Sequence, residues 1–109
     1  MSKPSSFSEF WPHYLADHRD PLNRRLHFVG TSLMAVALVT AVATGHLRLL
    51  LLCPLLGYGF AWVGHFVIEK NRPATFTHPI WSLVGDLKMV GLMWVGRLDL
   101  SETAERRAG

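Results

Sequence analysis

The chain has 109 residues, enough for one domain, and we expect a single helical domain over residues 1–109 with a loose polar tail from about residue 98. Half of the residues are hydrophobic and 17% are charged, against roughly 25% charged in an average soluble domain, so the composition favours a membrane protein. The net charge of +3 is scattered, and no block of lysines and arginines is present that would follow a phosphate backbone, which argues against a nucleic acid partner.

The first predicted element is an aromatic-rich helix between Ser5 and Asp17. Phe7, Phe10, Trp11 and Tyr14 follow the i, i+3, i+4, i+7 spacing of an amphipathic helix. Such a helix suits the membrane interface, where we expect it to lie flat, although packing against protein would produce the same pattern. The Asp-Pro pair at 20–21 ends it, because the residue before a proline is pushed out of the helical region.

Three apolar segments follow, and each is long enough to be considered as a membrane span. They cover Phe28–Thr44, Leu49–Ile68 and Pro79–Gly96. We therefore predict an all-α fold, a multi-span helical membrane bundle of about three spans plus the N-terminal amphipathic interfacial helix. A soluble helical bundle with an unusually apolar core is the alternative.

Three spans would place the N-terminal segment and the loop at 70–78 on one side of the membrane. The turn at 45–48 and the C-terminal tail would lie on the other side. Positive residues favour the first side, with Lys3, Arg19, Arg24, Arg25, Lys70 and Arg72 against Arg48, Arg97, Arg106 and Arg107. By the positive-inside rule we expect an integral membrane protein, of the inner membrane in a bacterium or the endoplasmic reticulum in a eukaryote, with that first side facing the cytoplasm.

Four histidines lie at the ends of the apolar segments on this predicted cytoplasmic side: His18, His27, His65 and His78. Imidazoles that converge at a membrane face are most simply a metal site. Neutral imidazoles suit iron, zinc or copper rather than magnesium or calcium, and the single cysteine excludes a thiolate site. Iron would activate O₂ whereas zinc would favour hydrolysis, and spacing alone does not choose between them. Taken singly, His27 is compatible with an ordinary interfacial residue and His78 with a loop residue, whereas His65, at the end of a long apolar segment, is less easily explained in this way.

Polar residues near these histidines are further candidates. Asn23 lies four residues before His27, and Glu69 lies four residues after His65, so each pair shares a helix face. Glu69 has a simpler alternative, which is a weak surface pair with an arginine three residues on. Asp86 lies inside the third apolar segment, where an unpaired acid is costly, so we expect it to face protein near the site.

Two sequence blocks resemble the 2-hydroxy fatty acid α-dioxygenase family. They are HRDPLNRRLHFVG, from His18 to Gly30, and GHFVIEKNRPA, from Gly64 to Ala74, followed by His78-Pro79, and the resemblance extends from about His18 to Arg97. It implies a multi-span membrane enzyme that uses Fe(II), with zinc less expected, and O₂ as co-substrate. It also implies metal ligands at His18, His27, His65 and His78, and catalytic roles, through orientation or substrate contact, at Asn23, Glu69 and Asn71, beside Asp86.

The implied reaction shortens a 2-hydroxy fatty acid by one carbon and releases CO₂. We expect the acid to chelate the iron through its carboxylate and hydroxyl, with Arg72, Lys70 or Arg24 neutralising the carboxylate. The acyl chain would lie between spans or along Phe60, Trp62 and Phe66. Two other classes stay open, a bis-histidine haem or electron-transfer protein and a non-catalytic membrane module.

Overall fold

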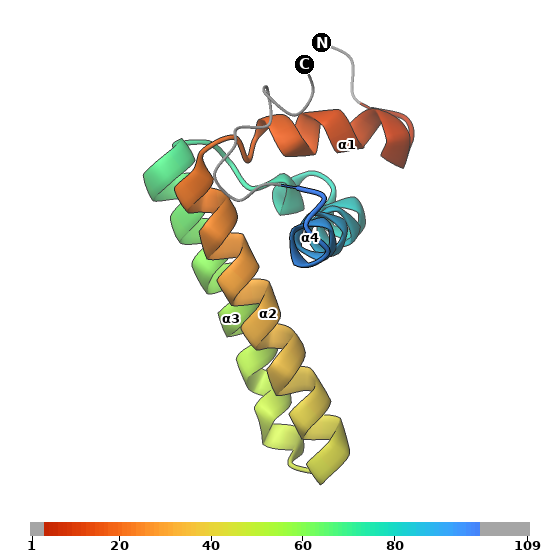
Figure 1. Cartoon of the computed structure of the whole chain (residues 1–109), viewed down its shortest axis with the longest axis vertical. Coiled ribbons are helices and arrows are strands. Elements are labelled where there is room, and N and C mark those ends of the chain that lie inside the picture. Colours follow the sequence, from red (N-terminus) through yellow and green to blue (C-terminus); the bar gives the residue numbers. More distant parts are fainter. Residues whose placement is uncertain (1–3, 99–109) are drawn as a thin grey trace.

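The computed structural model describes residues 4–98, and this part of the chain contains helices and no strand (Figure 1). The all-α prediction is confirmed. The elements in order are α1 (Phe7–Ala16), α2 (Pro21–Thr44), the 3-10 helix η1 (Leu47–Leu51), α3 (Leu52–Val63), the π-helical η2 (Gly64–Glu69), the 3-10 turn η3 (Ala74–Phe76) and α4 (Pro79–Trp94).

A long antiparallel hairpin is the main feature of the fold, with α2 as one arm and η1, α3 and η2 as the other (Figure 1). Local sequence signals set the limits of α2. The Asp20 side chain accepts a hydrogen bond from the Leu22 backbone N–H at 2.9 Å, and Pro21 occupies the first turn. Gly45 ends the helix with a φ of 75°, a left-handed conformation that favours glycine.

The two arms approach closely at Gly30. A Cβ at this position would lie 2.7 Å from the Phe60 Cβ and 2.8 Å from the Leu56 carbonyl oxygen. Because a backbone oxygen is one of the obstacles, a side chain here would force the arms apart. This glycine therefore fixes the spacing of the hairpin just below the histidines.

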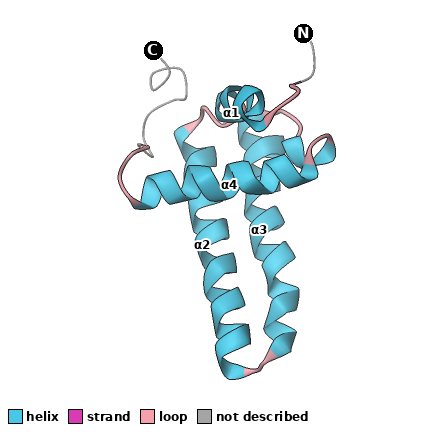
Figure 2. Cartoon of the chain, turned by 90° about the vertical axis from the view of Figure 1, so that its right-hand side faces the viewer, coloured by secondary structure: helices cyan, strands magenta, loops and turns pink. Residues whose placement is uncertain are grey.

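Figure 2 shows α4 lying across the hairpin, with α1 at the head of the hairpin, seen along its axis. The third predicted span corresponds to α4, whose 16 residues rise about 24 Å, which is short of a hydrocarbon layer of about 30 Å. A bundle of three aligned spans is therefore not confirmed. The crossing has a local cause: Asp86 bonds to His27 and Thr31, so the middle of α4 is held against α2.

The apolar face of α1 packs on α4. Phe10 and Tyr14 form a buried cluster with Met89, Met93 and Leu98. The predicted amphipathic helix is thus present, but its apolar face contacts protein rather than remaining available to lipid. The close approach of α1 is possible because Gly85 has no side chain; a Cβ there would lie 3.3 Å from the ring of Tyr14.

Leu98 in this cluster also corrects the expected position of the C-terminal tail. The chain leaves α4 on the histidine side, next to α1, and not beside the turn at 45–48. The reason is that α4 crosses the hairpin instead of running along it. The predicted loose tail lies outside the described residues, as do Lys3, Arg106 and Arg107.

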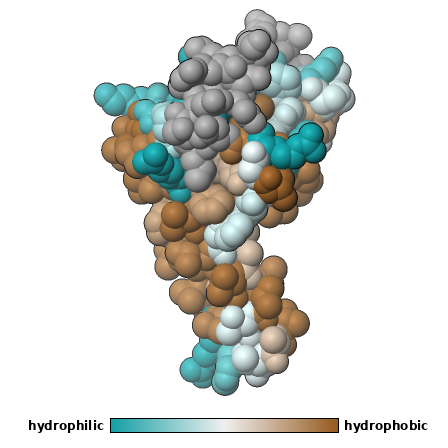
Figure 3. Space-filling model, in the orientation of Figure 1, coloured by the Kyte–Doolittle hydropathy of each residue, from teal (hydrophilic) through white to brown (hydrophobic). Residues whose placement is uncertain are grey.

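The hairpin exposes most of its apolar side chains (Figure 3). Two helical segments are long and apolar enough to cross a membrane, Pro21–Thr44 and Leu47–Glu69, with 22% and 11% of their most apolar windows buried inside the protein. A core helix of a soluble bundle would be mostly buried, so these fractions disfavour that alternative.

We predict that Gly30→Ala lowers the free energy of unfolding by about 1–3 kcal/mol, because its methyl group would overlap Leu56 and Phe60. Gly91→Ala in α4 is the matched control, since nothing lies within 4 Å of a Cβ there and alanine favours a helix by up to about 1 kcal/mol. Unfolding in detergent by heat or denaturant measures both. Equal stability of the two variants would contradict the close packing.

Candidate metal centre

Three histidines from three parts of the chain meet at the head of the hairpin. His18 lies between α1 and α2, His27 in α2, and His65 in η2. Each offers one ring nitrogen, and these three atoms all lie within 4.8 Å of one another. The ring centroids are 4.4 Å apart for His18–His27, 4.4 Å for His18–His65 and 5.1 Å for His27–His65. All three side chains are buried.

Each imidazole is oriented by a partner on its Nδ1 atom. His18 Nδ1 lies 2.6 Å from the Tyr14 carbonyl oxygen, His27 Nδ1 lies 2.9 Å from Asp86 Oδ1, and His65 Nδ1 lies 2.7 Å from Asn71 Oδ1. Asn71 presents its oxygen because its Nδ2 donates to the Asp17 carbonyl at 3.1 Å. All three partners are acceptors, so each Nδ1 carries the proton and each Nε2 keeps a free lone pair.

The Nε2 atoms of His18 and His27 are buried and make no hydrogen bond. Leaving a buried acceptor without a partner costs about 1–3 kcal/mol. A cation bound by the lone pairs would remove that cost, so the donor set fits a metal that prefers imidazole nitrogen.

The charge state of His18 suits this role. Burial lowers the pKa of His18 well below its usual value, and the neighbouring His27 and His65 lower it further. The ring is therefore neutral at physiological pH, and a neutral imidazole is the form that binds a metal.

The sequence around His65 allows the hairpin arms to approach at this point. Gly64 packs directly against the wholly buried side chain of Asn23, which occupies the space where a Cβ would stand. Asn23 thus serves the close contact between α2 and η2, next to the histidines. The π-helical turn is itself a feature often found at functional sites.

Asp86 lies where a carboxylate can support the metal centre. It bonds His27 through Oδ1 and accepts the Thr31 hydroxyl at 2.5 Å through Oδ2. A carboxylate on the far nitrogen of a ligand histidine fixes its orientation and raises its basicity. The expectation that this acid faces protein beside the site is met.

Glu69 lies at the edge of the site and is not in the three-histidine group. Its Oε1 accepts a hydrogen bond from the Asp20 backbone N–H, so it joins the end of η2 to the start of α2. This contact positions the loop that carries His18. Glu69 therefore bonds the backbone of Asp20, where the sequence had left a surface ion pair with Arg72 as the alternative.

The structure does not bring His78 into the group. This residue is the N-cap of α4, and its ring stacks on Trp81 at 5.4 Å and faces Phe10 at 5.3 Å. Its Nδ1 lies 2.9 Å from the Thr77 hydroxyl. The expected fourth ligand is absent from the cluster because α4 starts on the far side of Phe10, beneath α1.

The three cations expected to contact substrate do not line the cavity that contains His27 and His65. Arg24 is wholly buried, and its Nε donates to the His18 carbonyl at 2.7 Å, so it holds the His18 loop. Lys70 and Arg72 are exposed. Arg72 lines a separate hollow under α1, together with Asp17.

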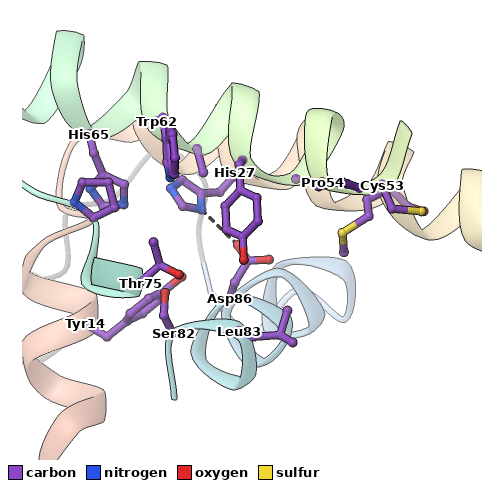
Figure 4. Close-up of a pocket in the computed structure, with 15 residues that line it drawn as sticks. Tyr14, His27, Cys53, Pro54, Trp62, His65, Thr75, Ser82, Leu83 and Asp86 are labelled. Carbon is purple, nitrogen blue, oxygen red and sulfur yellow. Dashed lines mark hydrogen bonds and ion pairs between the residues drawn. The ribbon is translucent and has the colours of Figure 1, made fainter. Parts of the chain in front are cut away.

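A cavity of about 100 Å³ reaches the metal centre from the side of the hairpin (Figure 4). His27, His65 and Asp86 line one end, and Cys53 and Pro54 line the other. Of the aromatic residues expected to contact an acyl chain, Trp62 lines this cavity, whereas Phe60 and Phe66 do not.

Residues 4–98 match the sequence profile of the Mpo1-like family, described as 2-hydroxy-palmitic acid dioxygenase Mpo1-like. The chain belongs to this family. The resemblance drawn from the two sequence blocks is therefore confirmed. No curated protein and no solved structure matches this Mpo1-like chain.

Several site residues of this Mpo1-like chain were not among the sequence candidates. Thr31 could have been found, because it lies four residues after His27 on the same helix face. Tyr14 acts through its backbone carbonyl, which leaves no signal in the sequence. Thr75 and Ser82 line the cavity from two elements and have no shared spacing with the histidines.

We predict that the purified protein binds one transition-metal ion per chain, and that His18→Ala, His27→Ala and His65→Ala each lose it. His78→Ala is the matched control and should retain the metal, because its ring lies outside the cluster. Elemental analysis of anaerobically prepared protein measures the ratio, with circular dichroism to check folding. Loss of metal in His78→Ala would restore a four-histidine site.

A second prediction concerns the orientation of His27. Asp86→Asn should weaken metal affinity about 10–100-fold while preserving stoichiometric binding at high metal concentration, since the amide loses the charge that supports the ligand. Competition with a chelator measures the affinity. An unchanged affinity would show that the Asp86 carboxylate does not contribute to metal binding through His27.

Proposed function

We propose that this chain is an Fe(II)-dependent dioxygenase that converts a 2-hydroxy fatty acid into the fatty acid one carbon shorter and CO₂. The observation that carries this function is the convergence of three buried imidazoles, two of which line one end of a largely apolar cavity. Three protein ligands leave coordination positions open for a substrate and O₂. The family's description as a 2-hydroxy-palmitic acid dioxygenase supports the substrate class.

The overall reaction balances without any further reductant. Conversion of R–CHOH–COOH to R–COOH and CO₂ releases four electrons, and these reduce one O₂ with formation of one water molecule. Iron held by His18, His27 and His65 would supply the redox chemistry, which zinc lacks. A small single-domain enzyme is therefore sufficient, with no site for a separate electron donor required.

The remaining site residues orient the ligand histidines and bind the substrate. Asp86 and Asn71 hold His27 and His65 by their Nδ1 atoms, so the rings keep their nitrogens directed inward as substrate enters. The hydroxyl-bearing residues Thr75 and Ser82 line the same cavity and can donate hydrogen bonds to a carboxylate (Figure 4). The metal's charge then balances the substrate carboxylate, in place of the cations expected from the sequence.

The membrane supplies the substrate in this arrangement. The hairpin crosses the bilayer, since α2 rises about 27 Å from His27 to Gly45, close to a hydrocarbon thickness of about 30 Å. The metal centre then lies at one interface, with α4 in the membrane plane and α1 above it. Positive residues on the histidine side, Arg19, Arg24, Arg25, Lys70, Arg72 and Arg97, against Arg48 at the tip, direct this face to the cytoplasm.

The haem alternative is disfavoured by the geometry. Two axial histidines must face each other across a flat macrocycle. Because all three ligand nitrogens lie within 4.8 Å of one another, a porphyrin between any two rings would overlap the third.

The test is turnover by Fe(II)-loaded protein with 2-hydroxypalmitate and O₂, read by mass spectrometry of pentadecanoate. We expect product with the parent and with His78→Ala, and a loss of at least about 100-fold with His65→Ala, because removal of a ligand or its support costs metal and activity. Zinc-loaded protein is a second control and should be inactive. If folded, metal-loaded protein forms no shortened acid, the proposed function is contradicted. That result would favour the alternative of a non-catalytic membrane module.

A further inference from the structure

We propose that the cavity beside the histidines is a groove for the hydrocarbon chain of the substrate, and that Gly57 and Cys53 set the chain length it accepts. This assignment depends on the proposed function, because the head of the chain is taken to be a 2-hydroxy acid at the metal centre. The occupant is argued from continuity: one set of lining residues includes His27 and His65 at one end and Cys53 at the other.

The groove has the composition and direction that a hydrocarbon chain requires. Away from the histidines its lining is mostly apolar, including Met34, Pro54 and Gly57. Figure 4 shows Cys53 and Pro54 at the end of the cavity remote from His65, further along the same helical arm. The groove therefore runs along the hairpin, parallel to neighbouring lipid chains in the proposed membrane arrangement.

One wall opens toward lipid. Tyr58 and Trp62 line the groove, yet they are 46% and 37% exposed. Their rings lie 5.6 Å apart along one face of α3. A cavity of about 100 Å³ is too small to enclose a long chain completely, so part of the chain would rest between this aromatic rim and the acyl chains of the bilayer. Substrate can enter sideways from the membrane without crossing water.

The length of the groove gives a scale for the substrate. At about 1.5 Å per residue, Gly57 lies about 12 Å and Cys53 about 18 Å from His65 along the arm. An extended hydrocarbon chain advances about 1.25 Å per carbon–carbon bond, slightly more than a peptide backbone, so about 10 carbons reach Gly57 and about 14 reach Cys53. An acid of about 16 carbons, with its first two carbons at the metal, would therefore place its methyl end beside Cys53.

Gly57 lines this path close to Met34. A Cβ there would lie 3.0 Å from the Met34 Sδ, the flexible end of a side chain that can move aside. A larger side chain at 57 would therefore fold and would fill the groove partway. Gly59, two residues on, has nothing within 4 Å of a Cβ and does not line the groove, which makes it a matched control on the same helix.

The first experiment uses Cys53, the only cysteine, as a reporter at the far end. Metal-free and Fe(II)-loaded protein in digitonin, which has no linear alkyl chain, is alkylated with N-ethylmaleimide in the presence of 2-hydroxy acids. At ten times its Kd, 2-hydroxypalmitate should slow alkylation about tenfold, since about one site in ten is then free. At ten times its Kd, 2-hydroxyoctanoate should leave the rate unchanged. Equal slowing by both acids, or by neither, would overturn the groove.

The second experiment compares Gly57→Leu with Gly59→Leu. Gly57→Leu should abolish the protection of Cys53 by 2-hydroxypalmitate and shift kcat/KM from the long acid to 2-hydroxyoctanoate by at least about tenfold, or about 1.4 kcal/mol. Gly59→Leu should match the parent. Identical behaviour of the two variants would overturn the groove. Length-dependent protection without turnover of any acid would support the groove and contradict the oxygenase instead, so the two failures are distinguishable.

Discussion

The fold depends on three buried imidazoles, each of which is oriented by a hydrogen bond to its Nδ1 atom. A backbone carbonyl, a carboxylate and an amide oxygen bind the Nδ1 atoms of His18, His27 and His65, and these acceptors come from α1, α4 and the loop after η2. One of these contacts, His27–Asp86, also joins α2 to α4, and Asn71 links its loop to the end of α1 through the Asp17 carbonyl. In the proposed metal centre, the contact that orients His27 is therefore also one that positions α4.

The hairpin brings the ligands to that point through close helix approach. Gly30 and Gly64 lack the side chains that would hold the arms apart, and Asn23 fills the space beside Gly64. Small residues at helix contacts are typical of membrane helices, where van der Waals packing rather than water exclusion drives association. Both glycines lie within a few residues of ligand histidines, so helix spacing and site geometry share one origin.

In the proposed membrane arrangement, the crossing of α4 decides how the site meets the bilayer. A third aligned span would have enclosed the histidines between helices, whereas a helix that crosses the hairpin leaves the side of the hairpin open below it. The cavity uses that opening, between Asp86 of α4 and Trp62 of α3. In the proposed function, a lipid-derived acid stays in its own leaflet while its head group reaches the iron.

The helical class, the two long apolar arms and the three clustered histidines, His18, His27 and His65, could all be predicted from the sequence, because hydrophobic length and motif spacing are properties of the chain alone. The family assignment rested on the same spacing and was confirmed. Tertiary structure decided that His78 stands apart, that α4 crosses the hairpin, and that Arg24 is buried beneath His18. The first two outcomes depend on contacts between residues distant in sequence, Phe10 with His78 and Asp86 with His27 and Thr31. Arg24 bonds the His18 carbonyl across the bend at Pro21, and hydrophobic periodicity does not specify the geometry of that bend.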